Sequence, residues 1–234
     1  MKSKILILSL FILGLFLVNP ANAEEENRDV PTFSEIALKI SAKVYLKQGD
    51  KQSVRIVAKE SVLEDIITDV KGRKLSIRFP NSNFFQRSFN PGKIEIYITV
   101  PEVDALSVSG SGDIECKELR SRILDMAVSG SGNIDIDDLD SKRVKASISG
   151  SGNIGIGDGG VAEDLTVSIS GSGNLKADGF EAENVQVSTS GSGNCKVFSN
   201  GSIKVRVAGS GSVYYNGNAS IDSSVAGSGR VEKM

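Results

Sequence analysis

The chain has 234 residues, including 25 glycines but no histidine and no tryptophan, and its formal net charge is −2. A charge so close to zero supplies no basic field for nucleic acid or anionic lipid, so we expect neither as a partner. The lack of histidine excludes a Ser-His-Asp triad and metal sites ligated by histidine.

Residues 1–23 have the composition of a secretory signal peptide. Lys2 and Lys4 precede the apolar run Ile5–Val18, and the small-residue pattern that ends at Ala23 is typical of a cleavage site. The apolar run is shorter than the ~20 residues that a transmembrane helix needs. We therefore expect an exported protein, in the periplasm, on the outer-membrane surface or outside the cell, with no membrane span after cleavage.

Residues 24–105 alternate between apolar and polar side chains, which predicts a β-rich region. One stretch in this region is ambiguous. The pattern Ser61-x-x-Glu64 resembles a capping box and favours a short helix over residues 61–71, whereas the β-branched residues at 66–70 favour a strand.

A polar segment at residues 80–92 carries three phenylalanines, Phe84, Phe85 and Phe89. Terminal units of repeat proteins usually act as caps, so we expect this segment to cover the end of the repeats that follow it. The alternative is a contact site for a partner.

From residue 106 to residue 234 the chain is a repeat. Gly-Ser-Gly occurs seven times at nearly even spacing, and the copies begin at Gly110, Gly130, Gly150, Gly171, Gly191, Gly209 and Gly227. The residue four positions after each of these glycines is apolar: Ile114, Ile134, Ile154, Leu175, Cys195, Val213 and Val231. Alternating apolar residues on both sides of the motif predict strands with one face inward.

A nearly fixed period of about 20 residues is typical of a solenoid, whose units bury their apolar faces only by stacking on their neighbours. We therefore predict an all-β fold, a single-chain parallel β-solenoid with about 20 residues per coil and an irregular N-terminal capping region. The predicted organisation is a signal peptide at 1–23, a capping β-rich region at 24–105 and the solenoid at 106–234.

The Gly-Ser-Gly motif predicts a corner between two strands. Glycine adopts positive φ without a Cβ clash, and we expect corner glycines such as Gly132 and Gly152 to need that freedom. Three positions after the first glycine stand Asp113, Asn133, Asn153, Asn174 and Asn194, followed by Ser212 and Arg230 in the last two copies. The first five predict a stacked polar column with a mainly structural role.

Two cysteines, Cys116 and Cys195, invite a disulfide in an oxidising compartment. The repeat places them four coils apart, roughly 19 Å at ~4.8 Å per coil, whereas a disulfide needs Cα atoms within about 7 Å. We expect two buried free thiols.

Chemistry-bearing clusters are scarce. Asp135, Asp137, Asp138 and Asp140 form the one dense carboxylate group, which is consistent with a Ca²⁺ site or, more simply, with a solvated acidic turn. Parallel β-helices also include polysaccharide lyases and hydrolases, but the outward residues before the corners are small and mostly unreactive: Ser107, Ala127, Ser147, Ser168, Ser188, Arg206 and Ser224. We assign no catalytic, cofactor or metal site and expect no enzyme activity.

The run Ser-Gly-Ser-Gly-Asn-Ile, present at Ser129–Ile134 and Ser149–Ile154, resembles the head GIN domain of putative auto-transporter adhesins over roughly residues 29–234. The resemblance implies a β-helix-like solenoid, bacterial export and an adhesive role. The leading hypothesis is a non-enzymatic exported binding module for an unknown envelope or surface ligand, protein or glycan. The alternative is a periplasmic envelope scaffold or stress-associated protein without an adhesive role, and a homo-oligomer is compatible with both.

Overall fold

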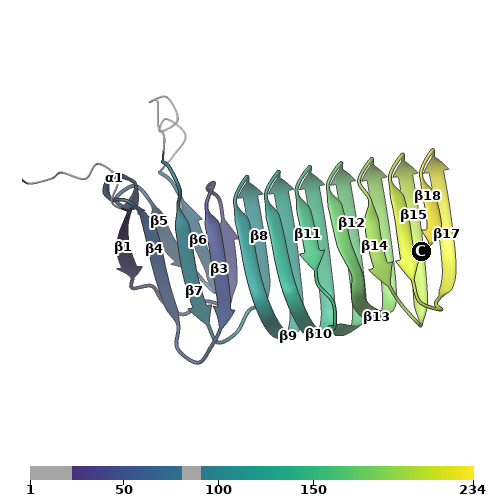
Figure 1. Cartoon of the computed structure of the whole chain (residues 1–234), viewed down its shortest axis with the longest axis horizontal. Helices are drawn as coiled ribbons and strands as arrows, with labels where there is room; N and C mark the ends of the chain where they lie inside the picture. The colour runs from purple at the N-terminus through teal and green to yellow at the C-terminus, as the bar shows by residue number, and fades with distance from the viewer. Residues whose placement is uncertain (1–22, 81–90) are drawn as a thin grey trace, which may run out of the picture.

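The computed structural model describes residues 23–80 and 91–234 and shows one elongated β-body (Figure 1). Two of the sequence predictions, the signal peptide up to residue 22 and the segment with Phe84, Phe85 and Phe89, lie outside the described residues. Within the described residues, no helix is long and apolar enough to cross a membrane.

The N-terminal half of the body contains eight strands and one short helix: β1 Ala23–Arg28, β2 Glu35–Leu38, β3 Lys43–Gln48, β4 Ser53–Lys59, α1 Glu60–Leu63, β5 Ile67–Lys71, β6 Lys74–Arg78, β7 Glu95–Val100 and β8 Ala105–Gly110. The repeats form the remaining strands: β9 Asp113–Gly130, β10 Asn133–Gly150, β11 Asn153–Ile156, β12 Val161–Gly171, β13 Asn174–Gly191, β14 Cys195–Phe198, β15 Ser202–Gly209, β16 Ser212–Asn216, β17 Ser220–Gly227 and β18 Arg230–Lys233.

The strands pair into two faces that enclose the core. The first face has the order β5-β6-β2-β8-β9-β10-β12-β13-β15-β17, and the second has the order β1-β4-β7-β3-β9-β10-β11-β13-β14-β16-β18. The long strands β9, β10 and β13 bend, so each contributes its first part to the second face and its last part to the first. All pairings among the repeats are parallel, with Ile114 beside Ile134 and Ile134 beside Ile154. The predicted parallel solenoid of about 20 residues per coil is confirmed, with about six turns.

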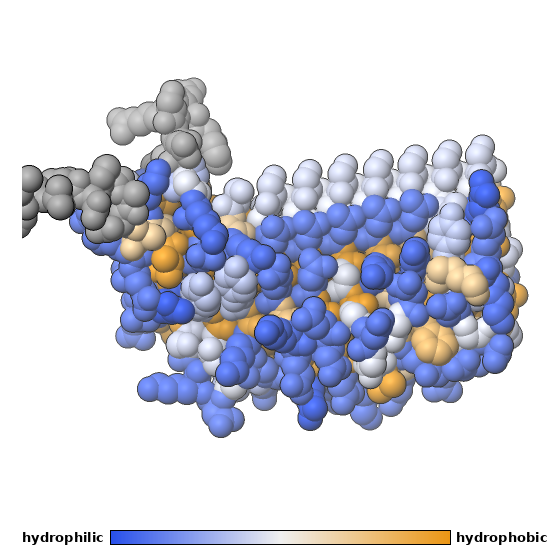
Figure 2. Space-filling view, viewed as in Figure 1, coloured by the Kyte–Doolittle hydropathy of each residue, from blue (hydrophilic) through white to orange (hydrophobic). Residues whose placement is uncertain are grey.

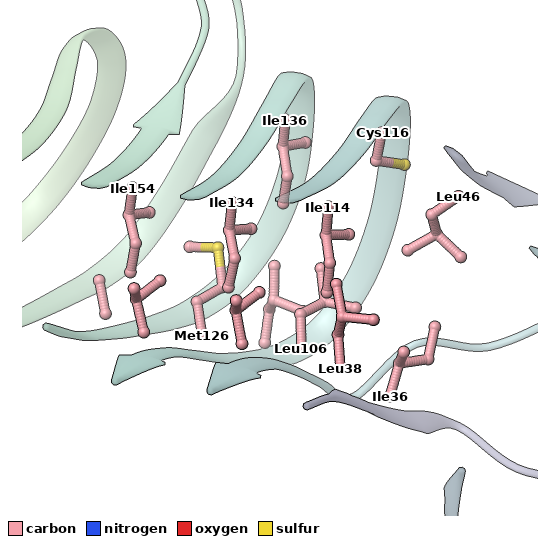
Figure 3. Close-up of a cluster of buried hydrophobic side chains, with 14 of the residues drawn as sticks. Ile36, Leu38, Leu46, Leu106, Ile114, Cys116, Met126, Ile134, Ile136 and Ile154 are labelled. Carbon is pink, nitrogen blue, oxygen red and sulfur yellow. The ribbon is translucent and has the colours of Figure 1, made fainter. Parts of the chain in front are cut away.

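The core is the space between the two faces. Figure 3 shows Leu106 and Met126 from the first face pointing toward Ile114 and Ile134 from the second. These four side chains are at most 1% exposed. Each buried aliphatic side chain contributes about 1.5–3 kcal/mol relative to an exposed one. Because one coil alone could not enclose them, stacking of coils is what forms the core.

The corners use their two glycines for different reasons. The first glycine of each motif has positive φ, as in Gly130 and Gly150 at +124°. The second glycine, such as Gly132 or Gly152, does not; a Cβ on Gly152 would lie 2.1 Å from the carbonyl oxygen of Gly132. Our expectation that Gly132 and Gly152 need positive φ is therefore wrong. They are required because the backbones of successive coils approach too closely for a side chain.

The predicted polar column is a continuous amide ladder. The Asn133 amide donates to Asp113 Oδ1 at 2.7 Å, and Asn153 donates in turn to Asn133 at 2.9 Å. The same contact continues through Asn174 and Asn194 at 3.0 and 3.3 Å. In Figure 2, the Gly and Ser corners form a pale row along the upper edge of the body, with a hydrophilic row directly beneath it.

The ambiguous segment contains both a short helix and a strand. Helix α1 covers only Glu60–Leu63, and residues 67–71 form β5, which pairs antiparallel with β6. The capping-box prediction is wrong: Lys59 is at the N-cap, without a side-chain cap bond. The β-branched residues pair with the β6 edge, and this tertiary contact outweighs the local helical signal.

The N-terminal region continues the stack before closing it. Strands β2 and β3 pair in parallel with β8 and β9, and β6 and β7 pair in parallel with β2 and β3. The direction then changes, because β4 and β5 pair antiparallel with β7 and β6, and β1 pairs antiparallel with β4. Segments far apart in the sequence thus lie side by side on the second face, where the candidate site is found.

Candidate functional site

An open groove of about 1370 Å³ lies on the outer surface of the second face, where the N-terminal strands meet the first two coils. Its walls come from β4, β7, β3, β9 and β10, the first three of which are neighbours at the N-terminal end of the body in Figure 1. The side chains that line it are aromatic, basic and acidic, and include Tyr45, Lys47, Arg55, Tyr97, Thr99, Glu115, Lys117, Glu118, Arg120, Asp135 and Asp137. This mixture distinguishes the groove from the outward row near the corners of the first face, which includes Ser107, Ala127, Ser147 and Ser168.

An ordered stack of side chains forms the N-terminal wall of the groove. Strand pairing places Arg55, Tyr97 and Tyr45 in one row across β4, β7 and β3. The Arg55 guanidinium lies 4.1 Å from the Tyr97 ring centroid, and the two tyrosine rings stack at 5.1 Å. The Tyr45 hydroxyl donates to Glu95 at 3.3 Å. Cation–π and stacking contacts of this kind hold the rings in a fixed orientation.

Gln48 joins the N-terminal region to the first coil at the rim of the groove. Its amide nitrogen donates to the carbonyl oxygens of Pro101 and Arg120, at 3.0 and 2.9 Å. Its amide oxygen accepts from the backbone N–H of Arg120 at 2.9 Å. Three bonds from one side chain fix the relative position of β3 and β9 at this rim, beyond the end of their paired residues.

Two carboxylates continue the same outward row, because Tyr45 on β3 pairs with Glu115 on β9. Glu115 and Asp135 are direct neighbours on β9 and β10, and Lys43 pairs with Glu115 at 2.6 Å. Burial raises the pKa of Asp135, and the nearby negative charges of Glu115, Asp113 and Asp137 raise it further. The groove is therefore lined by mixed charges: Arg55 pairs with Glu25 at 2.6 Å, and β9 contributes the basic Lys117 and Arg120 as well as Glu115 and Glu118.

Strand geometry spreads the predicted carboxylate cluster apart. Asp135 and Asp137 lie on the outer surface of β10, whereas Asp138 pairs with Glu118 and Asp140 with Arg120 on the bend at the far edge. Across residues 23–80 and 91–234, no group of three or more Cys, Asp or Glu side chains is arranged to hold a metal ion. The Ca²⁺ alternative gains no support from this arrangement, and only two of the four residues line the groove.

Both cysteines are free and buried, as predicted. Cys116 lies beneath the groove, where burial raises the pKa of its thiol to about 11, and burial also raises the pKa of Cys195. A thiol with a raised pKa is a poor nucleophile at neutral pH. Neither residue therefore supplies chemistry to the groove.

The residues that make the groove distinctive were not singled out in the sequence. Tyr45, Arg55 and Tyr97 are outward residues of ordinary alternating strands, and they meet only because β3 and β4 both pair with β7. The outward tyrosines were the available signal. To infer the groove from these tyrosines, one would need to know which strands pair, and these strands are far apart in the sequence.

The chain is similar to solved structures along most of its length. The crystal structure of a putative adhesin from Bacteroides fragilis is 25% identical in sequence and has a TM-score of 0.83. The aligned region covers 91% of this chain and 97% of the B. fragilis chain. A putative adhesin from Parabacteroides distasonis matches with 21% identity and a TM-score of 0.75, over 91% of this chain and 97% of its own. A structure described as a putative lipid binding protein, also from P. distasonis, has 23% identity, a TM-score of 0.74 and the same coverage. The last two show the fold alone.

No curated protein matches the chain. The family model described as "Putative auto-transporter adhesin, head GIN domain" matches residues 32–219, which include the groove and most of the coils. This match covers most of the sequence and agrees with the structural neighbours. The chain therefore belongs to the family of the head GIN domain of putative auto-transporter adhesins.

Proposed function

We propose that this protein is an exported, non-enzymatic binding module that contacts a surface ligand through the groove between its N-terminal strands and its first coils. The observation that carries the proposal is the groove itself: a preorganised Arg55–Tyr97–Tyr45 stack continues along the same outward row into Glu115 and Asp135, and this row lines an open space of about 1370 Å³. Aromatic residues and arginine are the side chains most enriched at binding hot spots. Family membership and the adhesin-like neighbours support an adhesive role.

The groove suits an extended polar ligand better than an apolar one. Its lining carries both acidic and basic side chains, and the tyrosine rings are held by Arg55 and by each other, so little ordering would accompany binding. A surface glycan or a polar peptide segment both fit this description. The buried thiol of Cys116, whose pKa is raised to about 11, gives no support to a role for this residue as a nucleophile.

The first test separates the two ligand classes. Wild-type protein and the Arg55→Ala variant are applied to an array of bacterial and host surface glycans and to an array of polar peptides. The proposal expects binding on one array, reduced by about tenfold in the variant, since loss of one hot spot costs at least ~1.4 kcal/mol. Binding that is unchanged in Arg55→Ala would move the ligand site away from the groove.

A second test addresses export. Proteolysis of intact cells, followed by detection of the protein, distinguishes an adhesin from a periplasmic scaffold. A surface module is removed by the protease, whereas a periplasmic protein is protected until the outer envelope is opened.

A further inference from the structure

The two ends of the solenoid differ in how they are closed. At the N-terminal end, α1 packs against β1 and β4, and its residues Val62 and Leu63 are 2% and 5% exposed (Figure 1). At the other end, among the described residues, β17 pairs only with β15, and β18 only with β16. The hydrogen-bonding edge of each of these two strands therefore faces outward along the solenoid axis.

Apolar side chains that are buried in the interior coils are exposed at this open end. Ile221 and Val225 are 37% and 40% exposed, whereas Ile203 and Val207, at the same positions one coil earlier, are 1% and 3% exposed. Orange, hydrophobic surface is visible at this end of the body in Figure 2. An unpaired strand edge with an exposed apolar inner row is a template for further strand pairing.

We propose that a second copy of this chain covers the open end, forming a tail-to-tail dimer in which β17 of each copy pairs antiparallel with β18 of the other. The two-fold axis of this dimer lies perpendicular to the solenoid axis and runs from the Gly-Ser-Gly edge to the opposite edge. Rotation about it places the open end of one copy directly over the open end of the other. β17 runs toward the corner and β18 runs away from it, so this axis makes the new pairs antiparallel. The interface is self-complementary, because each copy contributes one strand to each pair.

The residue positions favour this arrangement. Val225 and Val231 lie three residues on either side of Ser228, at matching heights on the two faces, so Val225 meets Val231 of the second copy inside the core. The same register sets the outward Ser224 opposite Glu232 of the second copy. It also sets Ala226 opposite Arg230 of the second copy, so no like charges are opposed.

The other two-fold arrangement is less favourable. Pairing β17 with β17 and β18 with β18, at full overlap of the end faces, would set Lys233 opposite Lys233 of the second copy, which is destabilising. Head-to-tail stacking would have to displace α1, which covers the core at the N-terminal end, where β1 and β5 each pair with only one described strand. The charges of β18 thus disfavour the other closed dimer, and the helix over the N-terminal core disfavours an open filament.

The oligomeric state tests the proposal directly. The full chain is expressed and purified in the form that its host produces after any processing. Its oligomeric state is measured by sedimentation velocity at concentrations from micromolar to hundreds of micromolar. We expect a monomer–dimer equilibrium, and Val225→Lys or Val231→Lys should weaken the dimer at least about tenfold, because each would bury an unpaired charge at the interface. Val161→Lys is the matched control, since Val161 is an exposed apolar residue, at 54%, away from the open end.

A crosslink tests the register. In one chain, Ser224 and Glu232 lie on opposite outer faces, so a Ser224→Cys, Glu232→Cys double variant should form no intrachain bridge. In the proposed dimer each new cysteine lies opposite its counterpart in the second copy, and a short thiol crosslinker should give a covalent dimer. A wild-type monomer at all concentrations, open polymers, a dimer unaffected by the two lysine variants, or a dimer that fails to crosslink would each overturn the proposal.

Discussion

Replacing the second glycine of a corner tests why the repeat has its sequence. In Gly152→Ala, the new Cβ would lie 2.1 Å from the Gly132 carbonyl oxygen and 2.5 Å from the Val128 side chain. Backbone bonds at 2.9 and 3.2 Å hold residues 152 and 153 to the preceding coil, so the corner cannot move away without weakening them. We expect a loss of about 3 kcal/mol in the free energy of unfolding, the upper part of the usual range for overpacking, because the obstructing atom belongs to the backbone.

Two matched variants separate this effect from others at the corner. Gly110→Ala tests positive φ alone, because Gly110 has φ of +113° and a Cβ at this position would have no atom within 4 Å; we expect a loss of about 2 kcal/mol. Ser151→Ala, exposed at the tip, should change stability by less than about 0.5 kcal/mol. Urea unfolding followed by circular dichroism gives all three values. If Gly152→Ala is no more destabilising than Ser151→Ala, close approach of the coils does not explain the second glycine.

Three further predictions concern the amide ladder, the carboxylate of Asp135 and the two thiols. Asn153→Ala removes three side-chain hydrogen bonds and should lower the free energy of unfolding by about 1–2 kcal/mol. Arg230→Ala is the control, because Arg230 stands in the same column but makes no ladder bond, and it should change the free energy of unfolding little. Urea unfolding measures both values. The pKa of Asp135 is raised in the folded state, so its ionised form destabilises the fold at pH 7. The Asp135→Asn variant should therefore be more stable than wild type at pH 7, and the difference in stability should shrink as the pH falls. Thermal melts at several pH values measure this difference. Cys116 and Cys195 should resist alkylation until the protein unfolds, and a disulfide between them, detected by mass spectrometry, would contradict the register. Because burial raises the pKa of the Cys116 thiol from 9 to about 11, the protonated thiol stabilises the fold, and this contribution should be lost as the pH rises from 9 through about 11.

Repetition made the fold predictable from the sequence. The fourth residue after each first glycine is apolar in every copy, so the inward row from Ile114 to Val231 could be assigned without knowledge of the structure. The amide ladder was predictable for the same reason, since stacking equal units places equal positions side by side. The two cysteines were correctly separated by the same argument.

Where repetition ends, local signals were not sufficient. A helix over residues 61–71 was one of two expectations, but β5 is a strand because its partner β6 offers an edge, which is a tertiary fact. The close approach behind Gly152 depends on the distance between coils, which composition does not reveal. The groove depends on the pairing of β3 and β4 with β7, so Tyr45 and Tyr97 looked like ordinary outward residues.

The most direct test of the central claim compares two tyrosines on the same outer row of the second face. Tyr97 lines the groove, whereas Tyr214 lies near the open end, outside the groove, and both are half-buried. The measurement is the binding of labelled wild-type, Tyr97→Ala and Tyr214→Ala proteins to purified cell envelopes. A groove-based binding module predicts that Tyr97→Ala binds at least about tenfold more weakly while Tyr214→Ala binds like wild type. Equal binding of the two variants would contradict it.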